Sequence, residues 1–153
     1  IEDERLLDLV FTPRRKLLSS YQLRCSANKV DNLSYVIKDN SKKVVGSIRF
    51  WNIKVDSHSS RGLLLGPLAV HPIYQSEGLG EKLVLNGIEK AHSDNWNWIV
   101  LVGDLDYYSK FGFSKNPTRG ISIRNSLDNS RLLGLDINDR FLEAAVGSLI
   151  EAS

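Results

Sequence analysis

Several residue types are scarce in this chain of 153 residues or missing from it. Methionine is absent and the chain begins at Ile1, so we expect the natural start to lie upstream. The single cysteine, Cys25, cannot form a disulfide within the chain, which is compatible with a reducing cytoplasm; we expect it to be a small, at least half-buried side chain. No apolar run approaches the roughly 18 residues that span a bilayer, and no basic-then-apolar leader is present. These absences predict a cytoplasmic protein without a membrane partner.

A large excess of charge is also missing. The formal net charge is +2, which is too small to suggest a nucleic-acid surface, so no nucleic-acid partner is expected. The basic clusters at residues 14–16 and 42–43 are typical of solvated faces or turns, with contact to an acidic substrate as the alternative. We expect no metal site. The length suits one core, and no repeat or low-complexity linker interrupts it, so residues 1–153 are predicted to form a single domain.

Two nucleotide-binding motifs are absent, although a glycine-rich turn is present. The chain has no Gly-Lys-Ser or Gly-Lys-Thr of the nucleoside triphosphatase type, and the third glycine of the dinucleotide fingerprint is missing. Two glycines of the turn permit close backbone approach, and the free amides of a following helix favour anions. The turn therefore predicts a phosphate-binding loop, with an ordinary loose turn as the alternative. Its residues are Gln75, Ser76, Glu77, Gly78, Leu79 and Gly80.

The segments on both sides of this turn support that prediction. Residues 62–70 form a continuous apolar run, which is typical of a strand covered on both faces. Pro67 cannot donate to a regular ladder, so we expect a bulge or a splayed edge there. The backbone of Leu68, Ala69 and Val70 would then be left for a ligand that carries amides. After the turn, helical spacing predicts an amphipathic helix that ends near residues 94–95, with these apolar positions: Leu79, Leu83, Val84, Ile88 and Ala91.

A second apolar strand is expected at residues 97–103. Strand, turn, helix and strand form a parallel crossover unit, whose ligand site lies at the carboxyl ends of the strands. A polar turn at residues 39–43 separates candidate strands at 33–38 and 44–55, which predicts an antiparallel hairpin. The expected fold class is α/β (α+β), with a mixed central sheet splayed between the strands near 62–70 and 97–103 and helices on both faces.

The two ends of the chain carry weaker patterns. Two helical segments are expected before residue 25, separated at Pro13. Residues 114–129 are expected to be irregular or weakly stranded, followed by a strand at 132–137. A terminal helix is predicted at residues 141–150, because Phe141, Ala145 and Leu149 would share one face.

The second strand runs into Asp104, a tyrosine pair at 107 and 108, and a Phe-Gly-Phe sequence at 111–113. Together with the loop at 75–80, these motifs resemble the GNAT superfamily of acyl-coenzyme A dependent N-acetyltransferases. The similarity is best between about residues 33 and 113, and is closest to bacterial members that carry Val-Gly-Asp or Leu-Gly-Asp before the tyrosines, as residues 102–104 do here. It implies the GNAT fold, with the usual first strand missing or truncated.

The resemblance also implies roles for individual residues. The loop would bind the pyrophosphate of acetyl-coenzyme A through backbone amides, and residues 68–70 would pair with the pantetheine arm. Tyr108 corresponds to the general acid near the thioester sulfur. A phenol with a pKa near about 10 is protonated at neutral pH and can donate to a thiolate whose thiol has a pKa of about 8.5. Ordinary packing is the alternative for both tyrosines. The implied coenzyme contacts are Leu68, Ala69, Val70, Gln75, Ser76, Glu77, Gly78, Leu79, Gly80 and Tyr107.

A general base is not marked by the sequence. Many relatives carry a glutamate on the strand equivalent to residues 62–70, and this run contains no carboxylate. Asp104 is expected to cap the tyrosine helix, His71 to lie in a solvated loop, and His92 to favour a helix end. A base acting through water is the remaining alternative.

The implied activity is transfer of acetyl from acetyl-coenzyme A to a primary amine of a small molecule or protein, by direct attack through a tetrahedral intermediate. The alternative is a non-catalytic module that senses acyl-coenzyme A or regulates a partner. An enzyme that acetylates transfer RNA is disfavoured, because the modest charge attracts phosphates weakly. We expect a monomer or a homodimer.

Overall fold

The computed structural model describes residues 23–24, 27–56, 58, 60–124, 126, 129–138 and 140–152. The first predicted helical segment, residues 14–22 of the second, the missing or truncated first strand and Cys25 lie outside the described residues. Leu23 and Arg24 are helical. Within the described ranges, none of the helices combines the length and the apolar character that crossing a bilayer demands.

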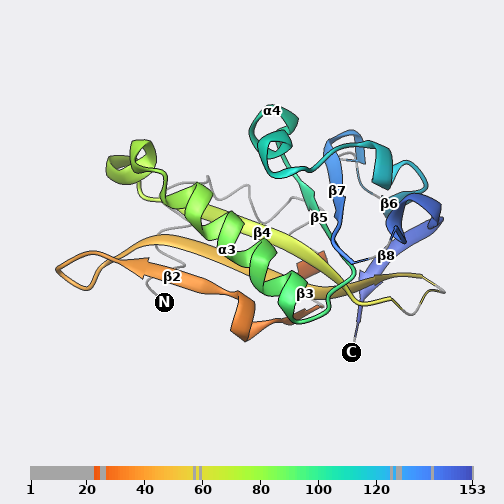
Figure 1. Cartoon of the computed structure of the whole chain (residues 1–153), viewed down its shortest axis with the longest axis horizontal. Coiled ribbons are helices and arrows are strands. Elements are labelled where there is room, and N and C mark those ends of the chain that lie inside the picture. Colours follow the sequence, from red (N-terminus) through yellow and green to blue (C-terminus); the bar gives the residue numbers. More distant parts are fainter. Residues whose placement is uncertain are drawn as a thin grey trace.

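The fold is built on one mixed sheet, shown in Figure 1 with α3 lying across β3 and β4. Its strand order is β6-β8-β3-β4-β5-β7, and β1 and β2 also pair with β3. The strands are β1 (Asn28–Lys29), β2 (Tyr35–Lys38), β3 (Val44–Val55), β4 (Gly62–Val70), β5 (Trp98–Val102), β6 (Ile121–Ile123), β7 (Leu132–Asp136) and β8 (Gly147–Glu151). The helices are α3 (Leu79–Ser93) and α4 (Leu105–Tyr108), with 3₁₀ turns η2 (Asp31–Leu33), η3 (Pro72–Glu77), η4 (Ser109–Phe111), η5 (Asn116–Thr118), η6 (Asn129–Arg131) and η7 (Leu142–Ala144).

Both faces of the central strands are buried, which explains their continuous apolar runs. On β4, Leu63 and Leu65 belong to the core beneath α3, whereas Leu64 belongs to a second core on the opposite face. On β5, Ile99 belongs to the core beneath α3 and Trp98 belongs to the second core. The predicted mixed sheet and the amphipathic helix are therefore confirmed, with α3 covering one face. Of the helical residues described before β1, Leu23 lies in the second core.

The predicted hairpin is confirmed as β2 and β3, which pair antiparallel from Tyr35↔Ile48 to Lys38↔Val44.

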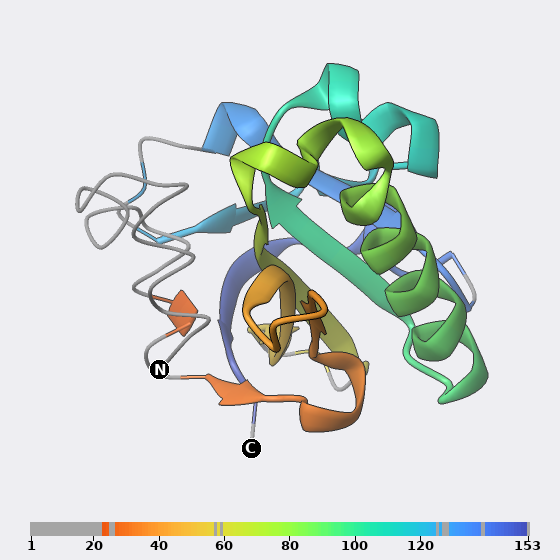
Figure 2. The same ribbon diagram turned by 90° about the vertical axis from the view of Figure 1, so that its left-hand side faces the viewer.

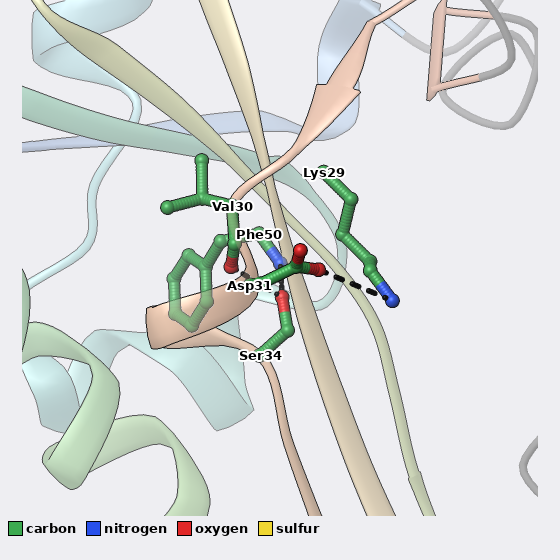
Figure 3. Close-up of polar contacts among 5 residues, drawn as sticks. All are labelled: Lys29, Val30, Asp31, Ser34 and Phe50. Carbon is green, nitrogen blue, oxygen red and sulfur yellow. Dashed lines mark hydrogen bonds and ion pairs between the residues drawn. The ribbon is translucent and has the colours of Figure 1, made fainter.

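A serine attaches the start of this hairpin to β3, as Figure 3 shows. The Ser34 hydroxyl donates to the Val30 carbonyl at 2.9 Å and accepts from the Phe50 amide at 3.1 Å. The Val30 amide in turn donates to the Phe50 carbonyl at 2.8 Å. Lys29 and Asp31 form an exposed ion pair at 3.6 Å beside this junction. Ser34 thus satisfies backbone groups where β3 passes from one edge partner to the next.

The terminal helix predicted at residues 141–150 is wrong. Only Leu142–Ala144 form a 3₁₀ turn, and residues from Gly147 onward form β8, which pairs with β3 on one side and with β6 on the other. The three residues that share a helical face are still directed inward, with Ala145 and Leu149 buried and Phe141 packed against the same core. The positions that a helix would have buried are buried here too. The backbone is nevertheless a strand, because it pairs with the edges of β3 and β6. The strand expected at 132–137 is confirmed as β7.

Candidate functional site

The candidate site lies where β4 and β5 stop pairing. The two strands are parallel neighbours only from Gly62↔Trp98 to Leu64↔Val100, although β4 continues to Val70. β5 remains paired with β7 up to its last residue, Val102. The far half of β4 therefore has β3 on one side and an opening on the other. This confirms the predicted splay.

A bulge in β4 accompanies the divergence. The β3 pairing passes from Ile48↔Leu68 to Phe50↔Leu65, so that two residues of β4, Gly66 and Pro67, oppose one residue of β3. Gly66 has φ of +142°, a conformation that other residues rarely adopt. The Trp51 indole N–H donates to the Gly66 carbonyl at 2.6 Å. The bulge expected at Pro67 is thus present, and a side chain from β3 satisfies its displaced carbonyl.

The glycine turn connects this opening to α3. Residues after His71 form the 3₁₀ turn η3, and Gly78 takes the left-handed conformation at φ +74° before the helix begins. A Cβ placed on Gly78 would meet no heavy atom within 4 Å, so the backbone faces open space there. The His71 imidazole Nδ1 accepts from the Ile73 amide at 3.2 Å, which gives this histidine a local role at the turn. The first amides of α3 have no acceptor within the helix, and the positive end of its dipole lies at the turn.

The tyrosine helix forms the opposite wall of the opening. The Asp104 carboxylate accepts from the Asp106 amide at 3.0 Å and caps α4, as expected. Tyr107 has its hydroxyl beside the turn, since a Cβ on Gly80 would lie 2.9 Å from that oxygen. Partial burial raises the Tyr107 pKa, and the nearby Lys110 ammonium offsets part of this rise. In Figure 2, η3 and α4 both lie in the upper part of the view, with the arrowhead of β5 beneath them.

Tyr108 lies deeper than Tyr107. Its ring packs against the core beneath α3 and makes an edge contact with Phe113, at 6.0 Å between ring centroids. Burial, and secondarily the neighbouring Tyr107, raises the pKa of Tyr108 from 10.0 to about 12. The phenol therefore keeps its proton at any physiological pH, so it can donate a hydrogen bond.

These walls enclose a groove of about 720 Å³, which brings most of the predicted coenzyme contacts together. Ala69 is buried, and Glu77, Leu79 and Tyr108 do not line the groove among the described residues. Sequence reasoning missed Glu81 and Lys110. Lys110 follows Tyr107 by three residues, a spacing that places both on one side of a helical turn and could have indicated it. The lining residues are Leu68, Val70, Gln75, Ser76, Gly78, Gly80, Glu81, Tyr107 and Lys110.

Another hollow, of about 800 Å³, lies at the opposite end of β4, beside Lys29, Arg61 and Trp96. It contains none of the residues predicted for the site. Among the described residues, no three His, Cys, Asp or Glu side chains gather in a way that could hold a metal ion.

The comparison with protein families decides the affiliation. The family model described as an acetyltransferase (GNAT) domain matches residues 31–115, which is more than half of the chain. The chain belongs to the GNAT acetyltransferase family. The matched region contains the splay, the glycine turn and the tyrosine helix of this GNAT domain.

Among curated proteins, the GNAT domain is similar to the uncharacterized N-acetyltransferase YhbS of Escherichia coli strain K12, with 31% identity over 81 residues. That alignment covers 53% of this chain and 48% of YhbS. The uncharacterized N-acetyltransferase YjhQ of the same strain is 36% identical over 73 residues, covering 46% of this chain and 40% of YjhQ. The chain thus spans about half the length of the curated relatives it matches.

Solved structures support the same fold. YhbS from Escherichia coli in complex with CoA gives a TM-score of 0.78 at 23% identity, covering 99% of this chain and 83% of that one. A GNAT family acetyltransferase from Brucella melitensis in complex with acetyl-CoA gives a TM-score of 0.66 at 23% identity, covering 99% of this chain and 85% of that one. The GNAT fold expected from the sequence is confirmed.

Proposed function

We propose that this GNAT domain binds acetyl-coenzyme A in the groove between β4 and α4 and transfers the acetyl group to a primary amine. The single observation that carries the proposal is the opening beside residues 65–70 of β4, which ends at a helix N-terminus. An extended ligand with amides in one part and phosphates in another fits this arrangement. The coenzymes in the YhbS and Brucella melitensis structures are ligands of that kind.

Residues of the groove can be assigned to parts of the coenzyme. Leu68 and Val70 line the groove, and their backbone is suited to the pantetheine arm. The Val70 carbonyl now accepts from the Gln75 side-chain amide at 3.0 Å, which shows that this oxygen is directed away from β3. The amides after Gly78 would hold the diphosphate, because Gly78 has open space beside it and the first amides of a helix have no acceptor within the helix. These groups are suited to acetyl-coenzyme A, and β4 and β5 are already unpaired beside them.

The bound thioester supplies an activated acetyl group, which the acceptor amine attacks directly to form a tetrahedral intermediate. The new bond joins the amine nitrogen to the carbonyl carbon, the carbon–sulfur bond breaks, and the sulfur leaves as a thiolate, which then takes a proton from water. Tyr108 is the residue that we assign to the sulfur, as a hydrogen-bond donor that stabilises the departing thiolate. The amine proton passes to water, because β4 carries no carboxylate and the Asp104 carboxylate is engaged as a helix cap. The acceptor is a small molecule or a protein.

A non-catalytic sensor of acyl-coenzyme A is the second candidate. It is favoured by the lack of a carboxylate on β4 and by the recessed position of Tyr108. Both candidates predict that acetyl-coenzyme A stabilises the domain, by about 2.7 kcal/mol at a hundredfold excess over the dissociation constant. No rise in melting temperature would contradict both.

Thiol release from acetyl-coenzyme A across a library of primary amines separates the two candidates. Release that depends on an amine, and is lost when desulfo-coenzyme A blocks the groove, is expected of the transferase. Stabilisation by acetyl-coenzyme A without thiol release from any amine would identify a sensor.

A further inference from the structure

An ion pair crosses the mouth of the groove between its two walls. The Lys110 ammonium, in η4, lies 2.7 Å from a carboxylate oxygen of Glu81, in the first turn of α3. The same ammonium lies over the Tyr107 ring, 4.2 Å from its centroid. All three side chains line the groove. Lys110 therefore contacts the Glu81 carboxylate on one side and the Tyr107 ring on the other.

The charges along the phosphate loop are unfavourable for an anion. Glu77 and Glu81 flank the glycines, and position 75 is glutamine. Lys110 is the one cation among the described lining residues. A ligand that carries a diphosphate would be repelled by the two carboxylates unless a positive charge lies nearby. Backbone amides supply only partial charges.

We propose that Lys110 binds the phosphates of the coenzyme, and that Glu81 positions Lys110 and competes with the ligand for it. This inference rests on the proposed function of the groove. The pair is accessible, with 43% of the Lys110 side chain and 51% of the Glu81 side chain exposed. Exposed ion pairs contribute little to stability, so an exchange of partner costs little. The diphosphate as a whole and the 3′-phosphate each carry more negative charge than one carboxylate, so Lys110 moves toward them when the ligand enters.

The test compares acetyl-coenzyme A affinity, measured by isothermal titration calorimetry, for the wild type and three variants. Lys110→Ala should weaken binding about tenfold or more, as expected for loss of one charge-assisted contact. Glu81→Gln should tighten binding severalfold, because it frees Lys110 and removes a negative charge. Lys82→Ala is the matched control, since Lys82 is an exposed lysine of the same helix turn that does not line the groove; it should bind nearly as the wild type does.

Two shortened ligands identify the phosphate involved. S-acetylpantetheine has no phosphate, and Lys110→Ala should bind it as the wild type does. Acetyl-dephospho-coenzyme A lacks only the 3′-phosphate. If the tenfold effect persists with it, Lys110 binds the diphosphate; if the effect disappears, Lys110 binds the 3′-phosphate. Both results support the inference.

The failures of the two proposals are distinguishable. If the wild type does not bind acetyl-coenzyme A, the proposed function itself is wrong. If the wild type binds and Lys110→Ala binds equally well, the assignment of Lys110 is overturned. An equal loss in Lys82→Ala, or weaker binding by Glu81→Gln, would also overturn it, because either result points to general surface charge or to a structural role of the pair.

Discussion

Replacing Tyr108 by phenylalanine removes one hydroxyl and leaves a ring that keeps its contacts with Phe111 and Phe113. The pKa of Tyr108 decides whether the hydroxyl transfers its proton to the sulfur or only donates a hydrogen bond. Burial raises this pKa to about 12. The thiol of the leaving group has a pKa of about 8.5, so complete proton transfer from the phenol to the thiolate is uphill by roughly 5 kcal/mol. Tyr108 therefore donates a hydrogen bond to the developing thiolate and keeps its own proton.

A hydrogen bond to a charged group contributes about 1.5–3 kcal/mol, which corresponds to a decrease in kcat of about 10- to 150-fold in Tyr108→Phe. The KM for acetyl-coenzyme A should change little. Steady-state thiol release with an amine substrate measures both constants. Tyr107→Phe is the matched control: its hydroxyl lies beside Gly80 in the groove, so this change should raise KM and leave kcat unaffected.

Two results would refute this reasoning. An unchanged kcat in Tyr108→Phe would show that the hydroxyl does not act on the sulfur. A loss above about a thousandfold would show that Tyr108 delivers its proton in full, as general acids with matched pKa values do.

Three further predictions concern the site and its scaffold. Gly103→Ala should lower kcat while acetyl-coenzyme A still binds, because the added Cβ would lie 2.7 Å from the Tyr108 ring and displace it; kinetics equal to the wild type would contradict this. Ser34→Ala should lower the free energy of unfolding by about 1–3 kcal/mol, since it leaves the Phe50 amide and the Val30 carbonyl without this partner; urea titration measures the loss, and exposed Ser41→Ala, which should change little, is the control. Stability should fall as pH rises from 10 to 12, because the pKa of folded Tyr108 lies above that of the unfolded chain and the unfolded state releases its proton first. Tyr108→Phe should remove a part of that fall on the order of 2–3 kcal/mol, and identical pH slopes in urea unfolding would argue against the buried phenol.

Much of the fold could be predicted because its signals are local. The apolar runs of β4 and β5, the helical spacing of α3 and the polar turn before β3 each occupy one continuous segment. The splay could be anticipated from Pro67 alone, since a residue without an amide hydrogen interrupts a ladder wherever the strand lies. The terminal segment could not, because the conformation of residues 147–151 depends on the edges offered by β3 and β6, which are distant in sequence.

The features of the site also divide into those that the local sequence predicts and those that depend on distant segments. The loop glycines and the tyrosine pair are recognisable as motifs, and the structure brings Gly78, Gly80 and Tyr107 to one groove. The Glu81–Lys110 pair joins residues 29 positions apart, so it depends on how α3 and η4 are placed relative to each other. The burial of the two tyrosines could not be predicted from the sequence either. Tyr107 and Tyr108 are adjacent, yet of the two only Tyr107 lines the groove among the described residues. Burial, which separates the two, is a property of the packed core.

Hydrogen–deuterium exchange with and without acetyl-coenzyme A tests most directly whether the opening beside β4 and the turn before α3 together hold the coenzyme. Binding should slow exchange in two separate segments, residues 68–70 and residues 78–82, and leave β6 and β8 unchanged. Saturating ligand that protects neither segment, or that protects residues around Lys29 and Arg61 at the other end of β4, would contradict the account.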